Sequence, residues 1–270
     1  MKKHVSLSLL ILLTVPAGAF SADDKQAMTG AEIISKHLAA VGGKEALANI
    51  KTRIAVGTVR KESEPDAQMA IMSEAPNRVS AMYVFKDYTW QMTYDGSTVI
   101  FRPTITKEAS LIEKKYREII TTGAMFNSIS LYNILIAGES DDLKFEAKGT
   151  KKLKNRPAYV VEIKRGKSQP LRLFFDAETF MWVRTEYGRV SFAKAIGKFT
   201  NDVTQHGEDQ TEVDFFFDTS DFKEVDGVKL PFKFEQTVAF PLIRQKSAGT
   251  IIGMIKEYRH NVDIDPKMFQ

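Results

Sequence analysis

Histidines and paired carboxylates are the residues of this sequence whose types could support chemistry. Beyond residue 20 the chain holds three histidines, His37, His206 and His260, on a predicted helix, in a polar loop and on the last predicted strand. None has a second histidine or a carboxylate at the spacing of zinc ligands. Because a metal site needs several convergent ligands, we expect all three at the surface and predict neither a metal nor a cofactor.

Two acidic stretches, 141–146 and 208–214, place carboxylates close enough for general acid–base work. No apolar surroundings in the sequence would raise the pKa of either pair, so we interpret both as solvated strand ends. The chain has no cysteine, which excludes disulfides, a thiol nucleophile and a thiolate metal site. The motifs of serine hydrolases, zinc proteases, nucleotide-binding loops and dinucleotide folds are also missing. We therefore predict that the protein is not an enzyme.

The first residues have the pattern of a secretory signal peptide. Two lysines precede an apolar run from about residue 5 to residue 15, and Ala17-Gly18-Ala19 supplies the small residues of a cleavage site. The run is shorter than the roughly 20 residues that span a bilayer. We expect cleavage of residues 1–19, export to the periplasm, and one domain over residues 20–270. No cysteine lies near the cut, so lipid anchoring is not expected.

The charge of the chain gives no sign of a nucleic-acid partner. The formal net charge is +4, and it falls to +2 when Lys2 and Lys3 leave with the signal peptide. Nucleic-acid-binding domains carry a basic stripe or a strongly basic balance, which this chain lacks. The lysine-rich stretch 148–156 is interpreted as a solvated turn.

Alternating apolar and polar residues predict a mainly β protein. Thr29 and Glu32 form a capping box that starts a helix over 29–41, and Gly42-Gly43 ends it. Strands are then expected at 52–62, 66–75, 77–87, 87–96, 97–103, 142–149, 158–165, 171–176, 180–187, within 188–201 and 210–219, at 226–240, and at 249–262. The stretch 107–137 does not alternate and predicts two helices split near Thr122-Gly123.

These elements predict an α+β fold: a curled antiparallel sheet of about eleven strands that forms an incomplete barrel. An N-terminal helix and a mid-chain helical lid, inserted at about 107–137, would lie against it. In the stretch 226–240, Pro231 lies on the polar parity and predicts an edge or a bulge. The apolar parity would face either a packed core or a cavity. Four methionines, Met69, Met72, Met82 and Met92, would give such a cavity an adaptable surface.

The order of elements and several local phrases resemble the outer-membrane lipoprotein carrier family, the LolA-like proteins. The phrases are "HLAAVGGKEALANIKT", "MTYDG", "FFDAETFMWVRTEY" and "VDGVKLPFKFEQ". The resemblance implies an incomplete barrel whose concave apolar face is covered by helices and binds acyl chains without covalent chemistry. It also implies a monomer that receives cargo from an inner-membrane transporter and passes it to an outer-membrane acceptor. Two features differ from the dedicated carrier of this family. The chain is longer, and neither Arg53 nor Arg60 is assigned the role of holding the lid. We therefore expect the cargo to be a lipoprotein, a lipid or another hydrophobic ligand.

Parity along the strands and along the lid predicts which side chains would line this cavity. They are Tyr83, Phe85, Trp90, Met92, Tyr94, Phe215, Phe217, Phe232 and Phe234 on strands, with Met125, Phe126, Leu131 and Leu135 on the lid. Two other functions stay open. One is an interaction module with a filled barrel and an exposed strand edge near Pro231, and the other is an enzyme with a shallow site.

Overall fold

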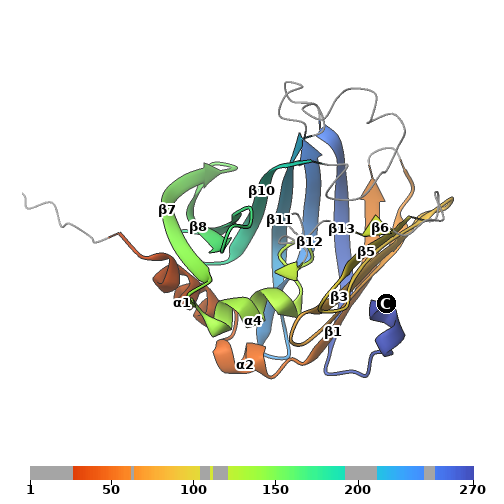
Figure 1. The fold of residues 1–270 in the computed structure, drawn as a ribbon, viewed down its shortest axis with the longest axis horizontal. Coiled ribbons are helices and arrows are strands. Elements are labelled where there is room, and N and C mark those ends of the chain that lie inside the picture. Colours follow the sequence, from red (N-terminus) through yellow and green to blue (C-terminus); the bar gives the residue numbers. More distant parts are fainter. Residues whose placement is uncertain (1–26, 62–63, 104–109, 112–120, 192–211, 240–246) are drawn as a thin grey trace, which may run out of the picture.

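A single curled antiparallel sheet organises the protein (Figure 1). The structure, a computed structural model, describes residues 27–61, 64–103, 110–111, 121–191, 212–239 and 247–270. Thirteen strands of this part follow the order β6-β5-β4-β3-β2-β1-β13-β12-β11-β10-β9-β8-β7. The two edge strands, β6 and β7, do not pair with each other, so the sheet stays open. The predicted fold class is confirmed.

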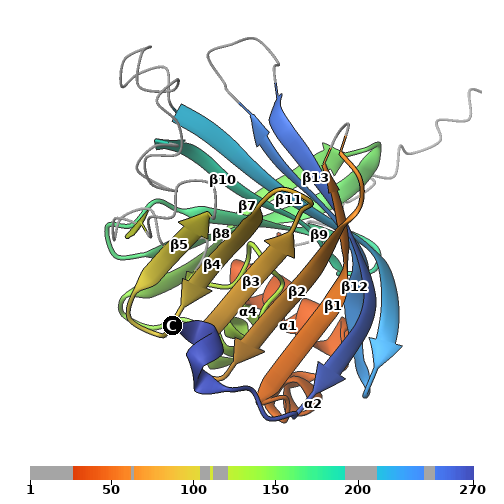
Figure 2. The same cartoon turned by 90° about the vertical axis from the view of Figure 1, so that its right-hand side faces the viewer.

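Two meanders make up this sheet. The first comprises β1 (Thr52–Lys61), β2 (Ala67–Glu74), β3 (Arg78–Val84), β4 (Thr89–Tyr94), β5 (Val99–Pro103) and β6 (Ser110–Leu111). The second comprises β7 (Leu143–Leu153), β8 (Arg156–Arg165), β9 (Leu171–Asp176), β10 (Trp182–Ser191), β11 (Glu212–Val225), β12 (Val228–Ala239) and β13 (Ser247–His260). They join where β13 pairs antiparallel with β1, so the last strand lies beside the first (Figure 2).

The observed strands differ from the predicted ranges in two places. The short strand β6 pairs with β5, Leu111 opposite Ile100 and Ser110 opposite Phe101, in a stretch predicted to be helical. Open hydrogen-bonding groups on the edge of β5 offered this segment a partner that local periodicity does not reveal. In addition, the strand predicted within 188–201 is, up to Ser191, the end of β10. The remainder of that prediction lies outside the described residues.

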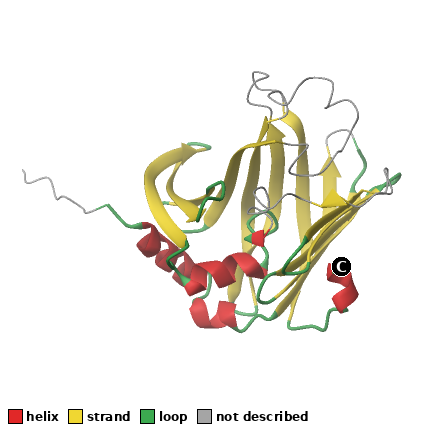
Figure 3. Cartoon of the chain, viewed as in Figure 1, coloured by secondary structure: helices red, strands yellow, loops and turns green. Residues whose placement is uncertain are grey.

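Three helices gather at one end of the concave side of the sheet (Figure 3). Helix α1 (Gly30–Ala40) begins with the predicted capping box: the Glu32 amide donates to Thr29 Oγ1 at 3.2 Å and the Thr29 amide donates to Glu32 Oε2 at 2.7 Å. A Cβ on Gly30 would lie 2.2 Å from the Phe145 carbonyl oxygen, so only glycine lets α1 approach β7 this closely. Helix α2 (Lys44–Ala48) follows directly.

The mid-chain lid is smaller than predicted within the described residues. A turn over 124–127 leads into α4 (Ile129–Ala137), where a helix over about 124–138 was expected. The other predicted helix contains β6 instead, and most of its length lies outside the described residues. None of the helices that the structure describes is long and apolar enough to cross a bilayer.

Pro231 does not mark an edge of the sheet, which corrects the sequence prediction. Strand β12 is interior, between β11 and β13. Its ladder with β13 begins only at Lys233, whereas Pro231 pairs with Phe222 of β11 alone. A proline that lacks an amide donor is tolerated where one side of the strand has no ladder. The predicted outer edge is therefore absent, although the side of Pro231 that faces β13 has no ladder partner.

A short 3-10 helix at the C-terminus, η4 (Pro266–Phe269), covers the outer, convex face of β3 and β4. Phe269 is 1% exposed and lies under the Arg78 guanidinium, 5.1 Å from the ring centre. Arg102 Nη1 donates to the Gln270 carbonyl at 2.8 Å. The predictions from sequence contained no such element.

The concave face as a candidate binding site

Strand register places one parity of side chains from each strand on the concave face, the face that α1, α2 and α4 cover. Met69 of β2 lies opposite Tyr83 of β3, and Tyr83 lies opposite Trp90 of β4. In the other meander, Phe234 of β12 lies opposite Thr219 of β11 and Gly253 of β13. The concave face is therefore a continuous surface that crosses both meanders.

All of the predicted cavity residues belong to one contiguous apolar cluster. Ten are at most 8% exposed: Tyr83, Phe85, Met92, Tyr94, Met125, Phe126, Leu131, Leu135, Phe217 and Phe234. The other three, Trp90, Phe215 and Phe232, are half-buried and pack against the same cluster. Sequence parity thus selected side chains that lie together in space.

Trp90 joins the sheet to the lid. Its ring stacks on Tyr83 with centroids 4.8 Å apart and meets the edge of Phe101 at 5.4 Å. Phe126, in the turn before α4, lies 6.3 Å from Trp90. Aromatic pairs at these separations add about 0.5–1.5 kcal/mol each beyond area burial. The lid is consequently held to this half of the sheet mainly by apolar contact.

A second aromatic group lies on the other half of the concave face. Phe217 stacks on Phe234 with centroids 5.1 Å apart and on Trp182 at 5.9 Å. A Cβ on Gly253 would lie 2.1 Å from the Phe234 ring, so this glycine leaves the space that the ring occupies. Phe232 meets the edge of Tyr258 at 5.3 Å.

The four methionines do not all serve this face. Met69 and Met92 share the concave parity with Tyr83, and both are buried in the cluster. Met72 and Met82 lie on the opposite parity, on the convex face. Only two of the four can therefore contact a ligand on the concave side, because alternate residues of a strand point to opposite faces.

Two of the predicted cavity residues line a cavity among the described residues. Tyr94 lines one of about 690 Å³ beside α4, and Phe85 lines one of about 460 Å³ near the β3–β4 turn. The role of the predicted cavity residues as the wall of a ligand cavity stays a prediction.

Arg53 is the residue of this face that sequence reasoning did not assign. It is 3% exposed on β1, and its Nη1 donates to the Asn127 carbonyl at 3.1 Å, directly before α4. Its guanidinium lies over the rings of Tyr132 (5.5 Å) and Tyr258 (5.9 Å). No carboxylate among the described residues forms an ion pair with it, and burial lowers its pKa. Arg53 has the same strand parity as the buried Ala55 and Val59, and this pattern in the sequence could have indicated that Arg53 faces the concave side.

Solved structures with the same architecture come from bacterial proteins. A domain named for outer membrane lipoprotein sorting, from Vibrio parahaemolyticus, matches at 11% identity with a TM-score of 0.51, covering 89% of this chain and 95% of that one. A DUF1329 family protein from Desulfovibrio piger ATCC 29098 matches at 9% identity with a TM-score of 0.50 and the same coverage. This chain therefore shares the fold of these two structures.

Other comparisons add little to this assignment. A LolA superfamily protein from Nitrosomonas europaea aligns over 90% of this chain and 98% of its own, at 12% identity with a TM-score of 0.49. No family model and no curated protein matches the sequence. At identities this low the likeness concerns the fold alone.

Within this fold, His37 is buried and His260 is half-buried, which corrects their predicted surface positions. His37 is 1% exposed, with Nδ1 2.9 Å from the Phe180 carbonyl and its ring 4.9 Å from Phe175. Burial lowers the pKa of His37 to about 4, so the ring is neutral and Nδ1 donates. The apolar stripe of α1 carries it into the core. His206 lies outside the described residues.

The other described histidine, the half-buried His260, contacts Arg53. Its Nε2 accepts from Arg53 Nε at 3.2 Å, and its Nδ1 lies 2.9 Å from Asp226. Burial, followed by the nearby arginine, lowers the pKa of His260. Among the described residues no three His, Asp or Glu side chains are placed to hold a metal ion. The imidazole contacts are therefore explained by packing and positioning.

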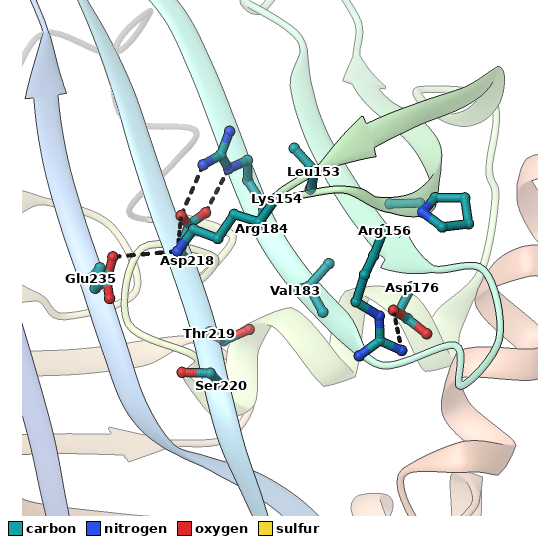
Figure 4. Close-up of a pocket in the computed structure, with 12 residues that line it drawn as sticks. Leu153, Lys154, Arg156, Asp176, Val183, Arg184, Asp218, Thr219, Ser220 and Glu235 are labelled. Atoms are coloured by element: carbon teal, nitrogen blue, oxygen red, sulfur yellow. Dashed lines mark hydrogen bonds and ion pairs between the residues drawn. The ribbon is translucent and has the colours of Figure 1, made fainter.

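The convex side of the sheet has a smaller hollow of about 170 Å³ under the β7–β8 hairpin (Figure 4). Ala158 and Val183 contribute apolar surface to it. The charges around it are paired: Arg184 contacts Asp218 at 2.5 and 2.8 Å, Lys154 contacts Glu235 at 3.5 Å, and Arg156 contacts Asp176 at 3.0 Å. The pairs of Lys154 and Arg156 connect the hairpin to other parts of the sheet, the pair of Arg184 joins β10 to β11, and each of these three cations has an acidic partner.

Proposed function

We propose that the protein is a non-catalytic carrier or binding protein that holds the acyl chains of a lipoprotein, a lipid or another hydrophobic ligand on its concave face. One observation carries the proposal. A continuous apolar surface of an open sheet is covered by a short apolar helix, α4, rather than closed off by further strands. The likeness to lipoprotein-sorting folds supports the same conclusion.

Acyl chains can compete with the lid for this surface. Each methylene that leaves water contributes about 0.8 kcal/mol, so one long chain can offset the apolar contacts that α4 makes. Binding then depends on the difference between the open and the closed state of the lid. A ligand with no greater affinity for the open state would not enter.

Hydrogen bonds attach the lid segment, residues 121–137, to the rest of the fold, and the groups of the lid that form them are neutral. Ile129 N donates to Ser73 Oγ at 3.4 Å, Thr185 Oγ1 donates to the Ala124 carbonyl at 3.4 Å, and Asn133 Nδ2 donates to the Pro76 carbonyl at 2.8 Å. Arg53 adds the charged contact to Asn127 described above. In the described residues no ion pair joins this segment to the sheet, so opening it would separate no opposite charges.

The proposal also covers the location of the protein and its partners. We infer that residues 1–19 are removed on export and that residues 20–270 act as one monomeric periplasmic domain. The natural partners would be an inner-membrane transporter that supplies cargo and an outer-membrane acceptor that takes it. A purely structural, filled barrel that binds another protein is the second candidate, and it is favoured by the close packing of the concave cluster.

Adjacent residues of β11 provide a matched test. Phe215 faces the concave side and Phe216 the convex side, and both are half-buried. The mature wild-type protein, Phe215→Glu and Phe216→Glu would be purified from a bacterial periplasm without detergent. Native mass spectrometry and solvent extraction would then identify any retained lipid, and uptake of a fluorescent fatty acid would be measured.

The proposal predicts a co-purified lipid or acyl probe in the wild type and in Phe216→Glu, with at least a tenfold weaker uptake in Phe215→Glu. The reason is that a carboxylate placed beside an acyl chain must be desolvated. A wild-type protein that carries no lipid and takes up no probe would contradict the proposal and favour the interaction module. An equal loss of lipid and probe binding in Phe215→Glu and Phe216→Glu would show that binding does not depend on the concave face in particular, which would contradict the proposal.

A further inference from the structure

Three ionisable side chains form a series of contacts that ends at the lid. Asp226, in the turn between β11 and β12, has Oδ2 2.9 Å from Nδ1 of His260 at the end of β13. Nε2 of His260 accepts from Nε of Arg53 at 3.2 Å, and Nη1 of Arg53 donates to the Asn127 carbonyl, directly before α4, at 3.1 Å. The imidazole is therefore connected to the lid through a single side chain.

The contact between His260 and Arg53 requires a neutral imidazole. A guanidinium has no acceptor, so Nε2 of His260 accepts this hydrogen bond only while it carries no proton. The one ring proton then lies on Nδ1, which donates it to Asp226. Uptake of a second proton turns Nε2 into a donor and places two cations side by side. The hydrogen bond is then lost, and repulsion replaces it.

Among the described residues, two charged groups and one phenol face the imidazole of His260. Arg53 faces it from β1 and Asp226 from the β11–β12 turn, whereas Tyr258 of β13 has its ring centre 6.5 Å away. Burial raises the pKa of Tyr258, so the phenol stays neutral. Only 3% of the His260 side chain is exposed, against 69% of that of Asp226. Burial and then Arg53 lower the pKa of His260 below its ordinary value of 6.5, while Asp226 opposes them.

The lid segment depends on Arg53 for its charged attachment. Its other hydrogen bonds to the sheet join neutral groups. Within the lid, the hydroxyl groups of Ser128 and Ser130 are buried and have no hydrogen-bond partner among the described residues. Opening would expose both hydroxyls to water, which satisfies them. Loss of the Arg53 contact therefore leaves the closed lid held mainly by apolar packing.

We propose that protonation of His260 releases the lid, so that the concave face opens as the pH falls. Arg53 moves away from the new cation and from Asn127, while His260 keeps its contact with Asp226. The open state, from which Arg53 has withdrawn, binds the proton more tightly, and acid consequently favours the open state. This inference rests on the proposed function and adds regulation to it, because ligand uptake and release then depend on pH.

Hydrogen–deuterium exchange of the lid tests this inference without a ligand. Amide exchange in residues 124–137 of the mature protein would be followed by mass spectrometry between about pH 7.5 and 4.5, with exchange times adjusted for the intrinsic effect of pH. His37→Gln serves as the parent protein, because the pKa of His37 is lowered to about 4 and its ring stacks on Tyr132 of α4 at 6.2 Å. The opening constant should rise below the pKa of His260, by at most about tenfold per pH unit.

Two substitutions act on His260 in different ways. His260→Gln keeps an acceptor for Arg53 but does not titrate, so the rise in lid exchange with acid should disappear. Asp226→Asn keeps an acceptor for Nδ1 but removes the charge that favours the imidazolium, so the rise should begin at a lower pH. Asp221→Asn is the matched control, because Asp221 also belongs to this hairpin but pairs with Lys223 at 3.0 Å. Its profile should match that of the parent protein.

The outcomes for the lid decide the inference. Loss of the pH dependence in His260→Gln, with a shifted rise in Asp226→Asn alone, upholds it. The same rise in His260→Gln as in the parent protein, or no rise in the parent protein at all, overturns it. If urea unfolding shows that His260→Gln does not fold, the comparison of Asp226→Asn with Asp221→Asn decides, since both carboxylates are on the surface.

Uptake of a fluorescent fatty acid over the same pH range separates this inference from the proposed function. Uptake by a protein whose lid exchange does not respond to acid removes the switch and leaves the carrier function standing. A lid that opens with acid through His260, in a protein that takes up no fatty acid at any pH, keeps the switch and removes the carrier function. If neither response is seen, both proposals are wrong.

Discussion

Two buried or half-buried arginines on opposite faces of the sheet have contrasting surroundings. Arg184, on the convex face, contacts both carboxylate oxygens of Asp218, at 2.5 and 2.8 Å, and this partner raises its pKa. Arg53, on the concave face, contacts a carbonyl, an imidazole and two aromatic rings, and burial lowers its pKa. One cation is paired with an anion, whereas the other is held by neutral groups.

Other buried polar groups also differ between the two faces in whether they have a partner. On the concave side Tyr83 Oη and Gln236 Oε1 are buried without a hydrogen-bond partner. The convex carboxylates Glu162 and Asp176 are buried with basic partners, Arg172 at 3.1 Å and Arg156 at 3.0 Å. A face that serves only stability satisfies its polar groups, since an unsatisfied one is costly. The convex face has an exception in Ser80, whose buried Oγ also has no partner, so the division holds for the charged groups and not for every hydroxyl.

The largest expected effect concerns the neutral histidine of the concave core. The pKa of His37 is lowered from 6.5 to about 4, so the unfolded chain binds a proton at a pH where the folded chain does not. Stability from this group is fully present above about pH 6.5, falls as the pH drops, and is lost by about pH 4. The complete loss is about 3 kcal/mol. Urea unfolding at several pH values would measure it.

His37→Gln is the control for this titration, because glutamine keeps a donor but does not titrate. Its stability should fall less between pH 6.5 and 4 than that of the wild type. The remaining slope includes His260, whose pKa is also lowered and whose contribution has the same sign. Identical slopes in wild type and variant would refute a neutral, buried His37.

The next effect compares the two arginines directly. Arg184→Met should destabilise the protein by about 1–3 kcal/mol, because Asp218 loses its bidentate partner while only 19% of its side chain is exposed. Arg53→Met should change stability by less than about 1 kcal/mol, since relief of an unpaired buried charge offsets the lost hydrogen bonds. Guanidinium unfolding of both variants gives the comparison.

Arg53→Met should nevertheless free the lid. The Asn127 carbonyl loses its donor, so amide exchange in residues 124–137 should become faster than in the wild type, and faster than in Arg184→Met. A loss of stability in Arg53→Met as large as that in Arg184→Met would show that the cation is structural and would remove the contrast between the faces.

Local patterns predicted the fold well because each acts over a few residues. The Thr29–Glu32 capping box, the Asp95–Gly96 turn and the alternation along 226–240 all depend on neighbours in sequence. The exceptions needed partners far away. Strand β6 depends on the edge of β5, and Pro231 is tolerated because the β13 ladder begins two residues later.

The site was predicted only in its apolar part. Parity selects large side chains such as Trp90 and Phe217, because the period of a strand is two. The polar members were missed for the opposite reason. Arg53 became notable only when the fold buried it beside the Asn127 carbonyl and the rings of Tyr132 and Tyr258. Burial and convergence are properties of the folded chain, and one sequence does not display them.

The smallest expected effect lies at the tip of the convex hairpin. Lys154 contacts Asp218 at 3.6 Å and Glu235 at 3.5 Å, but 71% of its side chain is exposed. Exposed ion pairs contribute about 0–1 kcal/mol, because water screens the charges and ordering a lysine costs entropy. Lys154→Ala should therefore destabilise the protein by less than about 0.5 kcal/mol in urea unfolding.

Lys152→Ala is the matched control, since Lys152 is exposed on the same hairpin and forms no ion pair among the described residues. The two variants should differ by no more than a few tenths of a kcal/mol, and that difference should vanish in high salt. A loss above about 1 kcal/mol in Lys154→Ala alone would mean that this ion pair, rather than the apolar contact of Leu153, closes the hairpin. In that case the exposed ion pair at the hairpin tip would contribute about as much to stability as the half-buried Arg184–Asp218 pair.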